Sequence, residues 1–291
     1  MFSQYFGQYL LNHGFLSPEQ LYQALEAQQA AHVKLGVLAM SEGFLTASQV
    51  EEIHQEQTRR DQRFGEIALA KGYLTQEQLD SLLASQRKGH LLLGQALIDA
   101  KILNLNQLGR ALKEYQEEHS LSDEQFSAVQ GGDFSLLLRK TLNLDDQDQV
   151  LNDYLSLFAK NIIRFISSQA WLTRCVNNET AVEDWSVVQQ ISGSPSLTTA
   201  IAGSQQSILK LASLFAKEEI KDMDELAQAS VAEFLNLHNG LFLVNMSNQG
   251  TELKLEPQVI NKAGFVTNQN CQVFEVNMVQ DKFSLIIEMK G

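Results

Sequence analysis

Residues 63–86 read RFGEIALAKGYLTQEQLDSLLASQ, and the landmarks of this stretch occur four times in the first 118 residues. The glycines that open the copies are 29 residues apart: Gly7, Gly36, Gly65 and Gly94. Seven residues after each opening glycine stand Gly14, Gly43, Gly72 and, in the fourth copy, Lys101. Self-similarity at a fixed period is typical of repeat architectures, because one unit cannot bury its apolar side alone whereas stacked units can.

Each copy predicts two helices joined by a tight turn. The second glycine fits the position just past a helix, where a left-handed residue ends it. In the first three copies a Ser or Thr then precedes a Gln by three residues, which is the capping-box pattern of a helix start, and in the fourth copy an Asn can cap the helix. The four pairs are Ser17 with Gln20, Thr46 with Gln49, Thr75 with Gln78, and Asn104 with Gln107. We therefore expect residues 1–118 to form an all-helical domain of four 29-residue helical hairpins in tandem.

These repeats resemble the MshEN motif at the amino end of type II secretion and pilus ATPases. The motif has Arg-Leu-Gly, a second glycine, a leucine ladder and a closing Gln. Arg63-Phe64-Gly65 matches the start best, the second copy has Lys34-Leu35-Gly36, and the closing residues are Gln28, Gln57 and Gln86. In some members a pair of such motifs binds cyclic di-GMP.

The resemblance implies a cyclic di-GMP site that uses Arg63 and Lys34. A guanidinium such as that of Arg63 can stack on guanine and also pair with phosphate, whereas the ammonium of Lys34 can only pair with phosphate. The alternative is that the glycines and leucines only build helical hairpins. The repeats would then be a protein-interaction module.

The second half of the chain follows a different pattern. Residues 119–144 lack the repeat landmarks, and we expect a connector there, with room for a helix of its own. Helical spacing of apolar residues predicts three helices, over Gln147–Ser168, Ser204–Lys217 and Asp222–His238. Short apolar or alternating runs predict strands over Ala170–Val176, Trp185–Ile191, Ser196–Ile201, Leu241–Met246, Thr251–Leu255, Val273–Met278 and Phe283–Met289.

Two turn signals divide these elements. Asn239-Gly240 is expected to stop the third helix, and Ser247-Asn248-Gln249-Gly250 to turn a hairpin between two strands. The order of elements predicts an α+β fold over residues 145–291, with one sheet and helices on one face.

The helix predicted over Asp222–His238 carries two polar residues three positions apart. At 100° per residue, Glu233 and Asn236 stand side by side on the outer surface, beside Ala229 and Ala232, while Leu226 falls on the buried side. Two polar tips among small side chains would let the surface of another protein come close. The alternative is that both residues are ordinary solvated positions of a helix.

This arrangement resembles the CheC/CheX family of chemotaxis phosphatases, in its CheX-like form. The family pattern is Glu-x-x-Asn in a surface helix, then a Gly, a strand hairpin and a Pro. Here the pattern is Glu233 and Asn236, Gly240 and Pro257, and the resemblance covers roughly residues 145–291. It implies that this half is a CheX-like α/β sandwich.

Two features depart from the wider family pattern. Many CheC-type members carry Asp or Ser four residues before the Glu, where this chain has Ala229. The earlier helix has Phe158 three residues before Asn161, so it cannot supply a second Glu-x-x-Asn site. One site per chain is the CheX-like arrangement.

The resemblance implies a chemotaxis or two-component signalling protein whose partner is the receiver domain of a CheY-like response regulator. Asn236 would position water against the aspartyl phosphate, and Glu233 would pair with a receiver lysine. The Mg²⁺ would be carried by the receiver, and the chain would need no cofactor of its own, with cyclic di-GMP as a possible ligand of the repeats. The open alternative is a non-catalytic interaction or adaptor protein. CheX relatives often pair through sheet edges, which suggests a homodimer through Val273–Met278 and Phe283–Met289.

The composition and simple sequence patterns bear on binding partners, cell compartment, membrane insertion and metal binding. Twenty-two Lys and Arg against 35 Asp and Glu give a net charge of −13. This negative charge and the lack of a basic cluster argue against binding to nucleic acid and against docking on an anionic membrane. The only cysteines are Cys175 and Cys271, which indicates a reducing compartment. The chain shows no signal-peptide pattern, no apolar run near the roughly 20 residues that span a bilayer, and no metal-ligand spacing. We therefore expect a soluble cytoplasmic protein without membrane insertion or a metal of its own.

Overall fold

The computed structural model describes residues 2–27, 34–57, 62–85, 92–167, 169–175, 184–262, 265, 270–278 and 281–290. The chain divides into two compact units, Met1–Lys140 and Thr141–Gly291. Some predicted positions lie outside the described residues, namely Gln28, Gln86, Ser168 and Val176.

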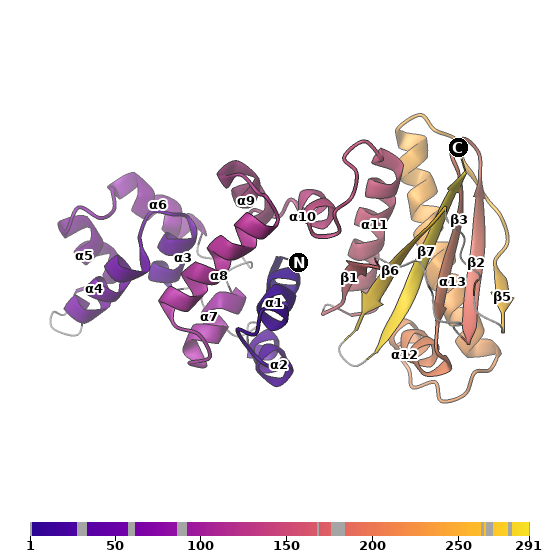
Figure 1. Cartoon of the computed structure of the whole chain (residues 1–291), viewed down its shortest axis with the longest axis horizontal. Coiled ribbons are helices and arrows are strands. Elements are labelled where there is room, and N and C mark those ends of the chain that lie inside the picture. Colours follow the sequence, from indigo (N-terminus) through magenta and orange to yellow (C-terminus); the bar gives the residue numbers. More distant parts are fainter. Residues whose placement is uncertain are drawn as a thin grey trace. The chain divides into compact units, whose positions relative to one another are not determined.

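The regular elements described in the first unit are all helices (Figure 1). They are α1 (Phe2–Asn12), α2 (Pro18–Ala27), α3 (Leu35–Ser41), α4 (Ala47–Gln57), α5 (Phe64–Ala70), α6 (Gln76–Ser85), α7 (Leu92–Asp99), α8 (Leu105–Glu118), α9 (Asp123–Gln130) and α10 (Phe134–Thr141). The last two helices occupy the stretch that we expected to be a connector. Helix α2 packs against α7, and α4 against α5, so the first copy lies beside the fourth and the second beside the third.

The predicted capping pairs make their reciprocal hydrogen bonds. In all four copies the Gln backbone N–H donates to the Ser, Thr or Asn side chain, and the Gln side-chain oxygen accepts from the backbone N–H of that residue, at 2.8–3.3 Å. The turns before them are left-handed, with φ of 68–70° at Gly14, Gly43 and Gly72. Lys101 has φ 56°, so the fourth copy keeps the turn without the glycine that adopts it most easily.

Each opening glycine lies where the two helices of a pair cross. A Cβ on Gly65 would lie 2.8 Å from Cδ1 of Leu79, closer than real Cβ contacts come. The same close approach joins Gly7 to Leu21 and Gly36 to Val50 at 2.8 Å, and Gly94 to Leu108 at 3.1 Å. The 29-residue spacing of the glycines thus follows from one steric requirement, met once in each pair.

The second unit contains a sheet and three helices among its described residues. The helices are α11 (Gln149–Phe165), α12 (Gln205–Ala216) and α13 (Glu225–Asn248). The strands are β1 (Trp171–Arg174), β2 (Trp185–Ser192), β3 (Ser196–Gly203), β4 (Lys254–Leu255), β5 (Val259–Asn261), β6 (Cys271–Asn277) and β7 (Lys282–Lys290). They form one antiparallel sheet in the order β1-β6-β7-β3-β2-β4, and β5 also pairs with β2.

Helices α12 and α13 lie against one face of this sheet (Figure 1). Helix α11 packs on α13 through aromatic rings, with Phe158 5.9 Å from Phe234 and Tyr154 5.0 Å from Phe242 between centroids. All four of these side chains are fully buried. The chain therefore mixes helix and sheet, as predicted, and the core that supports α13 lies between the helices and the sheet.

Helix α13 does not stop at Asn239-Gly240, so the predicted strand over Leu241–Met246 and the hairpin turn after it are wrong. The helix continues to Asn248, and the left-handed turn follows at Gly250, with φ +85°. A glycine inside a helix costs only about 1 kcal/mol relative to alanine. Burying Phe242, which is 0% exposed, contributes about 1.5–3 kcal/mol, so packing outweighs the local stop signal.

The strands proposed as sheet edges are also not edges. Strand β6 pairs with β1 on one side and β7 on the other, and β7 pairs with β6 and β3. Interior positions suit these strands because both strands carry buried apolar residues. Phe274 on β6 and Leu285 and Ile287 on β7 are at most 1% exposed. Among the described strands, β1 ends the sheet on one side, while β4 and β5 pair with β2 on the other.

Candidate functional site

Helix α13 carries Glu233 on the side that faces away from the core and Asn236 at the edge of that side, next to strand β2. The Asp224 side chain caps the helix by accepting from the Ala227 backbone N–H at 3.0 Å. Phe234 and Leu235 are 0% exposed, whereas Glu233 is exposed and Asn236 is half-buried. Glu233 therefore lies on the outer face of the helix, whereas Asn236 lies at the edge of that face, partly covered by the neighbouring strand.

The surroundings of this pair differ in detail from the helical wheel. Leu226, expected on the buried side, is 49% exposed, and Ala232, expected outside, is 9% exposed. The outer face of α13, which we call the α13 face, consists of Leu226, Ala229, Glu233, Asn236, Gly240 and Val244. The two polar tips thus stand among small and apolar side chains.

Strand β5 adds further apolar surface beside α13. Gln258, just before β5, donates from Nε2 to the Ala232 carbonyl at 3.4 Å, and this bond ties the segment to the helix. Val259 and Ile260 are both exposed. Among the described residues none makes a hydrogen bond or ion pair with the Glu233 carboxylate, so it can pair with a cation of another molecule.

The Asn236 side chain is held from the sheet. Its Oδ1 accepts from Nε2 of Gln189 on β2 at 3.0 Å. Gln189 is 1% exposed, and its Nε2 also donates to the Glu256 carbonyl at 2.9 Å. In the part of the chain that the structure describes, no residue accepts from the Nδ2 of Asn236.

Gln189 belongs to a buried polar network that joins α11, α13 and the sheet. Its Oε1 accepts from Nδ2 of Asn239 at 2.9 Å, and the same Nδ2 donates to Oγ1 of Thr199 at 3.0 Å. The Tyr154 hydroxyl donates to Oδ1 of Asn239 at 2.8 Å. Burial raises the pKa of the Tyr154 phenol above its ordinary value, so the hydroxyl stays protonated and remains a donor.

His238 lies next to this network and is neutral. It is 0% exposed, and its ring centroid lies 4.5 Å from that of Tyr154 and 4.9 Å from that of Phe158. Its Nδ1 lies 3.0 Å from Nδ2 of Asn161, and because an amide nitrogen only donates, Nδ1 is the acceptor. Burial lowers the pKa of His238 to about 3. The Asn161 side-chain amide therefore makes its hydrogen bond within the buried core.

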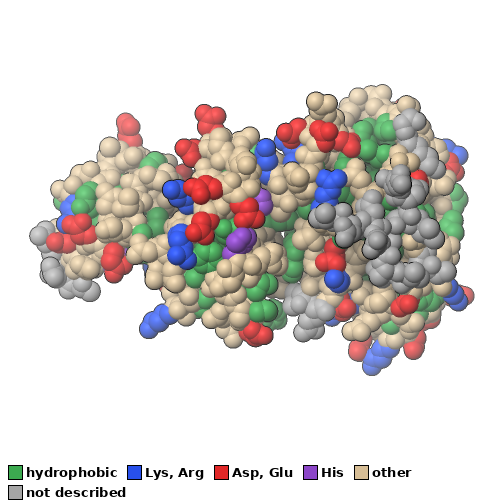
Figure 2. Space-filling model, viewed as in Figure 1, with side chains coloured by type: hydrophobic (Ala, Val, Ile, Leu, Met, Phe, Trp, Pro, Cys, Tyr) green, Lys and Arg blue, Asp and Glu red, His purple; other side chains and the backbone are tan. Residues whose placement is uncertain are grey.

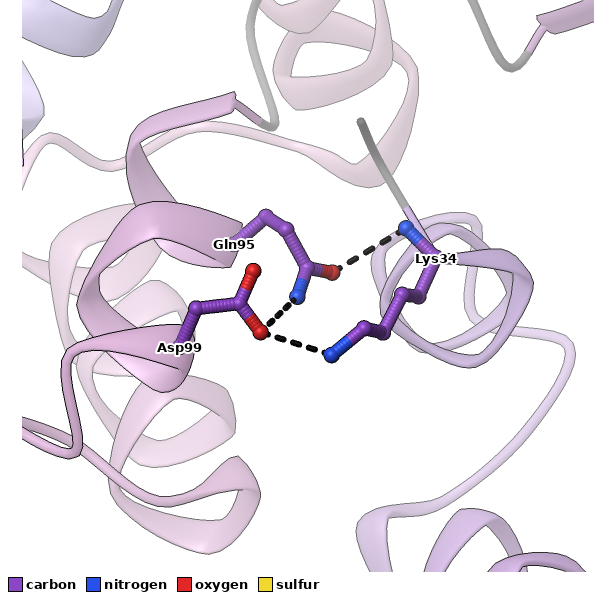
Figure 3. Close-up of polar contacts among 3 residues, drawn as sticks. All are labelled: Lys34, Gln95 and Asp99. Atoms are coloured by element: carbon purple, nitrogen blue, oxygen red, sulfur yellow. Dashed lines mark hydrogen bonds and ion pairs between the residues drawn. The ribbon is translucent and has the colours of Figure 1, made fainter. Parts of the chain in front are cut away.

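Lys34, predicted to bind cyclic di-GMP, is engaged within the first unit (Figure 3). Its Nζ lies 2.6 Å from Oδ1 of Asp99, and its backbone N–H donates to Oε1 of Gln95 at 3.0 Å. Gln95 is 0% exposed and also donates to Asp99 at 2.9 Å. Partial burial alone would raise the pKa of Asp99, but the hydrogen bonds from Lys34 and Gln95 outweigh it and lower the pKa.

Arg63, the other predicted ligand residue, lies at the start of α5. Its backbone N–H donates to Oε2 of Glu66 at 3.0 Å, and its side chain is exposed. Among the described residues its guanidinium has no ion-pair partner. Lys34 lines a pocket of about 400 Å³ together with His54 and Lys101, and Arg63 is not part of that lining.

The sequence alone missed the residues behind the site, above all Gln189. One signal was present in the strand Trp185–Ser192, where Val187 and Ile191 flank Gln189 at the spacing of one strand face. A polar residue between two inward apolar residues predicts a buried hydrogen bond. The neighbouring Gln190, which the alternation of the strand places on the opposite face, is exposed.

Two general properties of the described residues bear on other site types. No helix among them is both long and apolar enough to cross a membrane. No group of three or more His, Cys, Asp or Glu among them could hold a metal ion. On the face shown in Figure 2, acidic and basic side chains are interspersed over the helices of the first unit.

No family model and no curated protein matches the chain. It is similar to a CheC-like superfamily protein from Shewanella sp. PV-4, with 15% identity and a TM-score of 0.43, over 50% of this chain and 99% of that one. It is similar to the chemotaxis protein CheX from Vibrio vulnificus, with 13% identity and a TM-score of 0.42, over 49% and 99% of the two chains. A CheX–CheY–BeF3–Mg complex from Borrelia burgdorferi gives 14% identity and a TM-score of 0.42, over 49% and 99%.

Proposed function

We propose that the second unit hydrolyses the aspartyl phosphate of a CheY-type receiver domain, with Glu233 and Asn236 as the residues that enter the receiver's phosphorylation site. One observation carries the proposal: an exposed carboxylate and a half-buried carboxamide stand three residues apart on a well-packed helix, among small and apolar side chains. Such a surface can approach another protein closely while presenting two polar groups. The family resemblance of the Glu-x-x-Asn pattern supports the same assignment.

Hydrolysis of an aspartyl phosphate requires the protein mainly to position the reacting groups. An acyl phosphate is already activated, and the missing parts are an aligned water and stabilisation of the transferring phosphoryl group. The water oxygen forms a bond to phosphorus while the bond from phosphorus to the aspartate oxygen breaks, and its electron pair leaves with the carboxylate. The products are aspartate and dihydrogen phosphate, which releases a proton to solvent near neutral pH. Asn236 can donate from Nδ2 to the water or to a phosphoryl oxygen without changing its own protonation.

Glu233 has a different task in this proposal. Its carboxylate pairs with the lysine of the receiver's phosphorylation site and thereby fixes how the two proteins dock. The Mg²⁺ that the receiver carries offsets the charge that develops on the phosphoryl oxygens. The exposed apolar residues Leu226, Val244 and Val259 provide further contact area around the two polar tips.

The test is the decay of a CheY receiver labelled with ³²P from acetyl phosphate, with and without the full chain. We expect Asn236→Ala to lower kcat by about 100-fold or more, as for loss of an oxyanion-type donor, with KM changed only a few-fold. Asn245→Ala is the matched control, because Asn245 is an exposed asparagine on the same helix. Equal decay with wild type and Asn236→Ala would disprove the catalytic assignment.

The same experiment distinguishes the phosphatase from the alternative of a non-catalytic adaptor. If wild type leaves the label unchanged but binds the receiver loaded with beryllofluoride and Mg²⁺, the second unit is a non-catalytic binding module. Glu233→Gln should then weaken that binding, since it removes the charge proposed to pair with the receiver lysine.

We propose as a second candidate function that the first unit binds cyclic di-GMP through Arg63. The supporting observation is that its guanidinium is exposed and has no ion-pair partner among the described residues, whereas the Lys34 ammonium is paired with Asp99. Calorimetry with cyclic di-GMP should show binding that Arg63→Ala removes and Arg110→Ala keeps. No heat at high micromolar ligand with wild type would reject this function.

A further inference from the structure

We propose that Gln189 is a positioning residue that fixes which end of the Asn236 amide faces the partner protein. This inference deepens the proposed phosphatase function and rests on it. It concerns a residue 47 positions before Asn236 in the chain, on β2 rather than on α13. Gln189 is 1% exposed, so it acts through Asn236 and does not touch the receiver.

The orientation of the Gln189 amide is set by a backbone carbonyl. A carbonyl oxygen only accepts hydrogen bonds, so the atom 2.9 Å from the Glu256 oxygen must be the Gln189 nitrogen. The same nitrogen then donates its second hydrogen to Asn236, which must present its oxygen, at 3.0 Å. The polarity of the Asn236 amide therefore follows from chemistry that does not depend on telling nitrogen from oxygen by shape.

A second backbone carbonyl leads to the same assignment from the opposite side. The Thr199 hydroxyl donates to the carbonyl of Gln189 at 3.2 Å, so its oxygen accepts from the Asn239 nitrogen, at 3.0 Å. The Asn239 nitrogen also faces Oε1 of Gln189, at 2.9 Å, and the Asn239 oxygen accepts from Tyr154 at 2.8 Å. Each donor in this network meets an acceptor only if the Gln189 nitrogen points towards Asn236.

The consequence is that Asn236 turns its Nδ2, and so its hydrogen-bond donors, away from Gln189. A flipped Asn236 would place N–H groups against the N–H groups of Gln189, which loses one hydrogen bond and sets two donors face to face. Phosphoryl oxygens and the attacking water oxygen both accept hydrogen bonds, whereas an outward amide oxygen would repel a phosphoryl group. Gln189 thus selects the orientation that the proposed chemistry needs.

The first test is a double-mutant cycle on the decay of the ³²P-labelled CheY receiver. We expect Gln189→Met to lower kcat by about 10-fold to 100-fold, the loss typical of a misplaced group, with KM within about twofold of wild type. Gln190→Met is the matched control, since Gln190 has the same side chain at the next position and is exposed. In an Asn236→Ala background, Gln189→Met should cause no further loss, because a positioning residue has nothing left to position.

The second test does not depend on activity or on any variant that has to fold. In the wild-type chain labelled with ¹⁵N on Asn and Gln side chains, the Asn236 amide protons should exchange with water as fast as those of exposed asparagines, and the Gln189 amide protons should be protected. Protected Asn236 protons, or equal losses from Gln189→Met with and without Asn236, would overturn the positioning role. A wild-type chain that leaves the receiver labelled would instead reject the phosphatase function, and the exchange result would still decide the orientation.

Discussion

Lowering the pH from 7.5 to 5 should destabilise the second unit through one residue, His238. The side chain is 0% exposed, and burial lowers its pKa to about 3, against 6.5 for an exposed histidine. The unfolded chain takes up a proton as the pH falls through 6.5, whereas the folded unit does not until about pH 3. Because the unfolded state then binds more protons, stability is full above pH 6.5 and is lost as the pH falls from there towards pH 3.

The size of the loss follows from the two pKa values. Each pH unit below 6.5 costs about 1.4 kcal/mol, so at pH 5 the second unit should be less stable by about 2 kcal/mol than at pH 7.5. No other histidine lies in residues 141–291, and side-chain carboxyls titrate mainly below pH 5 in the unfolded chain. The window from pH 6.5 to 5 therefore isolates His238.

Urea unfolding followed by tryptophan fluorescence measures this unit within the full chain, because both tryptophans, Trp171 and Trp185, belong to it. With typical urea slopes, about 2 kcal/mol lowers the midpoint by roughly 1 M. His238→Asn keeps an acceptor near the Asn161 amide and removes the titration, so its midpoint should hardly depend on pH. His13→Asn, in the first unit, should behave like wild type. A midpoint that is constant in wild type, or that falls equally in His238→Asn, would refute the reasoning.

Three glycine substitutions should differ in sign. Gly240→Ala should stabilise the second unit by about 0.5–1 kcal/mol, because Gly240 is inside a helix and nothing lies within 4 Å of the added Cβ. The urea midpoint followed by tryptophan fluorescence should rise accordingly, and a lower midpoint would contradict this. Gly65→Ala should destabilise the first unit by about 1–3 kcal/mol, because its Cβ would lie 2.8 Å from Leu79, and circular dichroism at 222 nm can follow it. Gly109→Ala, also in a helix but with its nearest contact at 3.6 Å, is the control and should be neutral or stabilising.

Local signals in the sequence predicted the start of the second helix in each repeat. A capping box joins residues three apart, as in Thr75 and Gln78, so its hydrogen bonds form wherever the helix begins. The spacing of Glu233 and Asn236 likewise places both on one side of any helix that contains them.

Long-range packing decided the parts that the sequence did not predict. Asn239-Gly240 carries a local stop signal, yet Asn239 accepts and donates buried hydrogen bonds and Phe242 fills the core, so the helix continues. The order of the strands also depends on packing, because hairpin patterns do not say which strand will pair with β1.

The amino-acid sequence by itself determined where the second helix of each repeat begins and that Glu233 and Asn236 are neighbours on one helix, because these features depend on residues within one turn of each other. Only the tertiary structure decided that Gln189 reaches Asn236, since strand β2 and helix α13 meet through packing between distant segments. The physical reason is range: the three-residue geometry of a helix is built into the backbone, whereas a buried hydrogen bond across 47 residues exists only once the sheet and helix have packed.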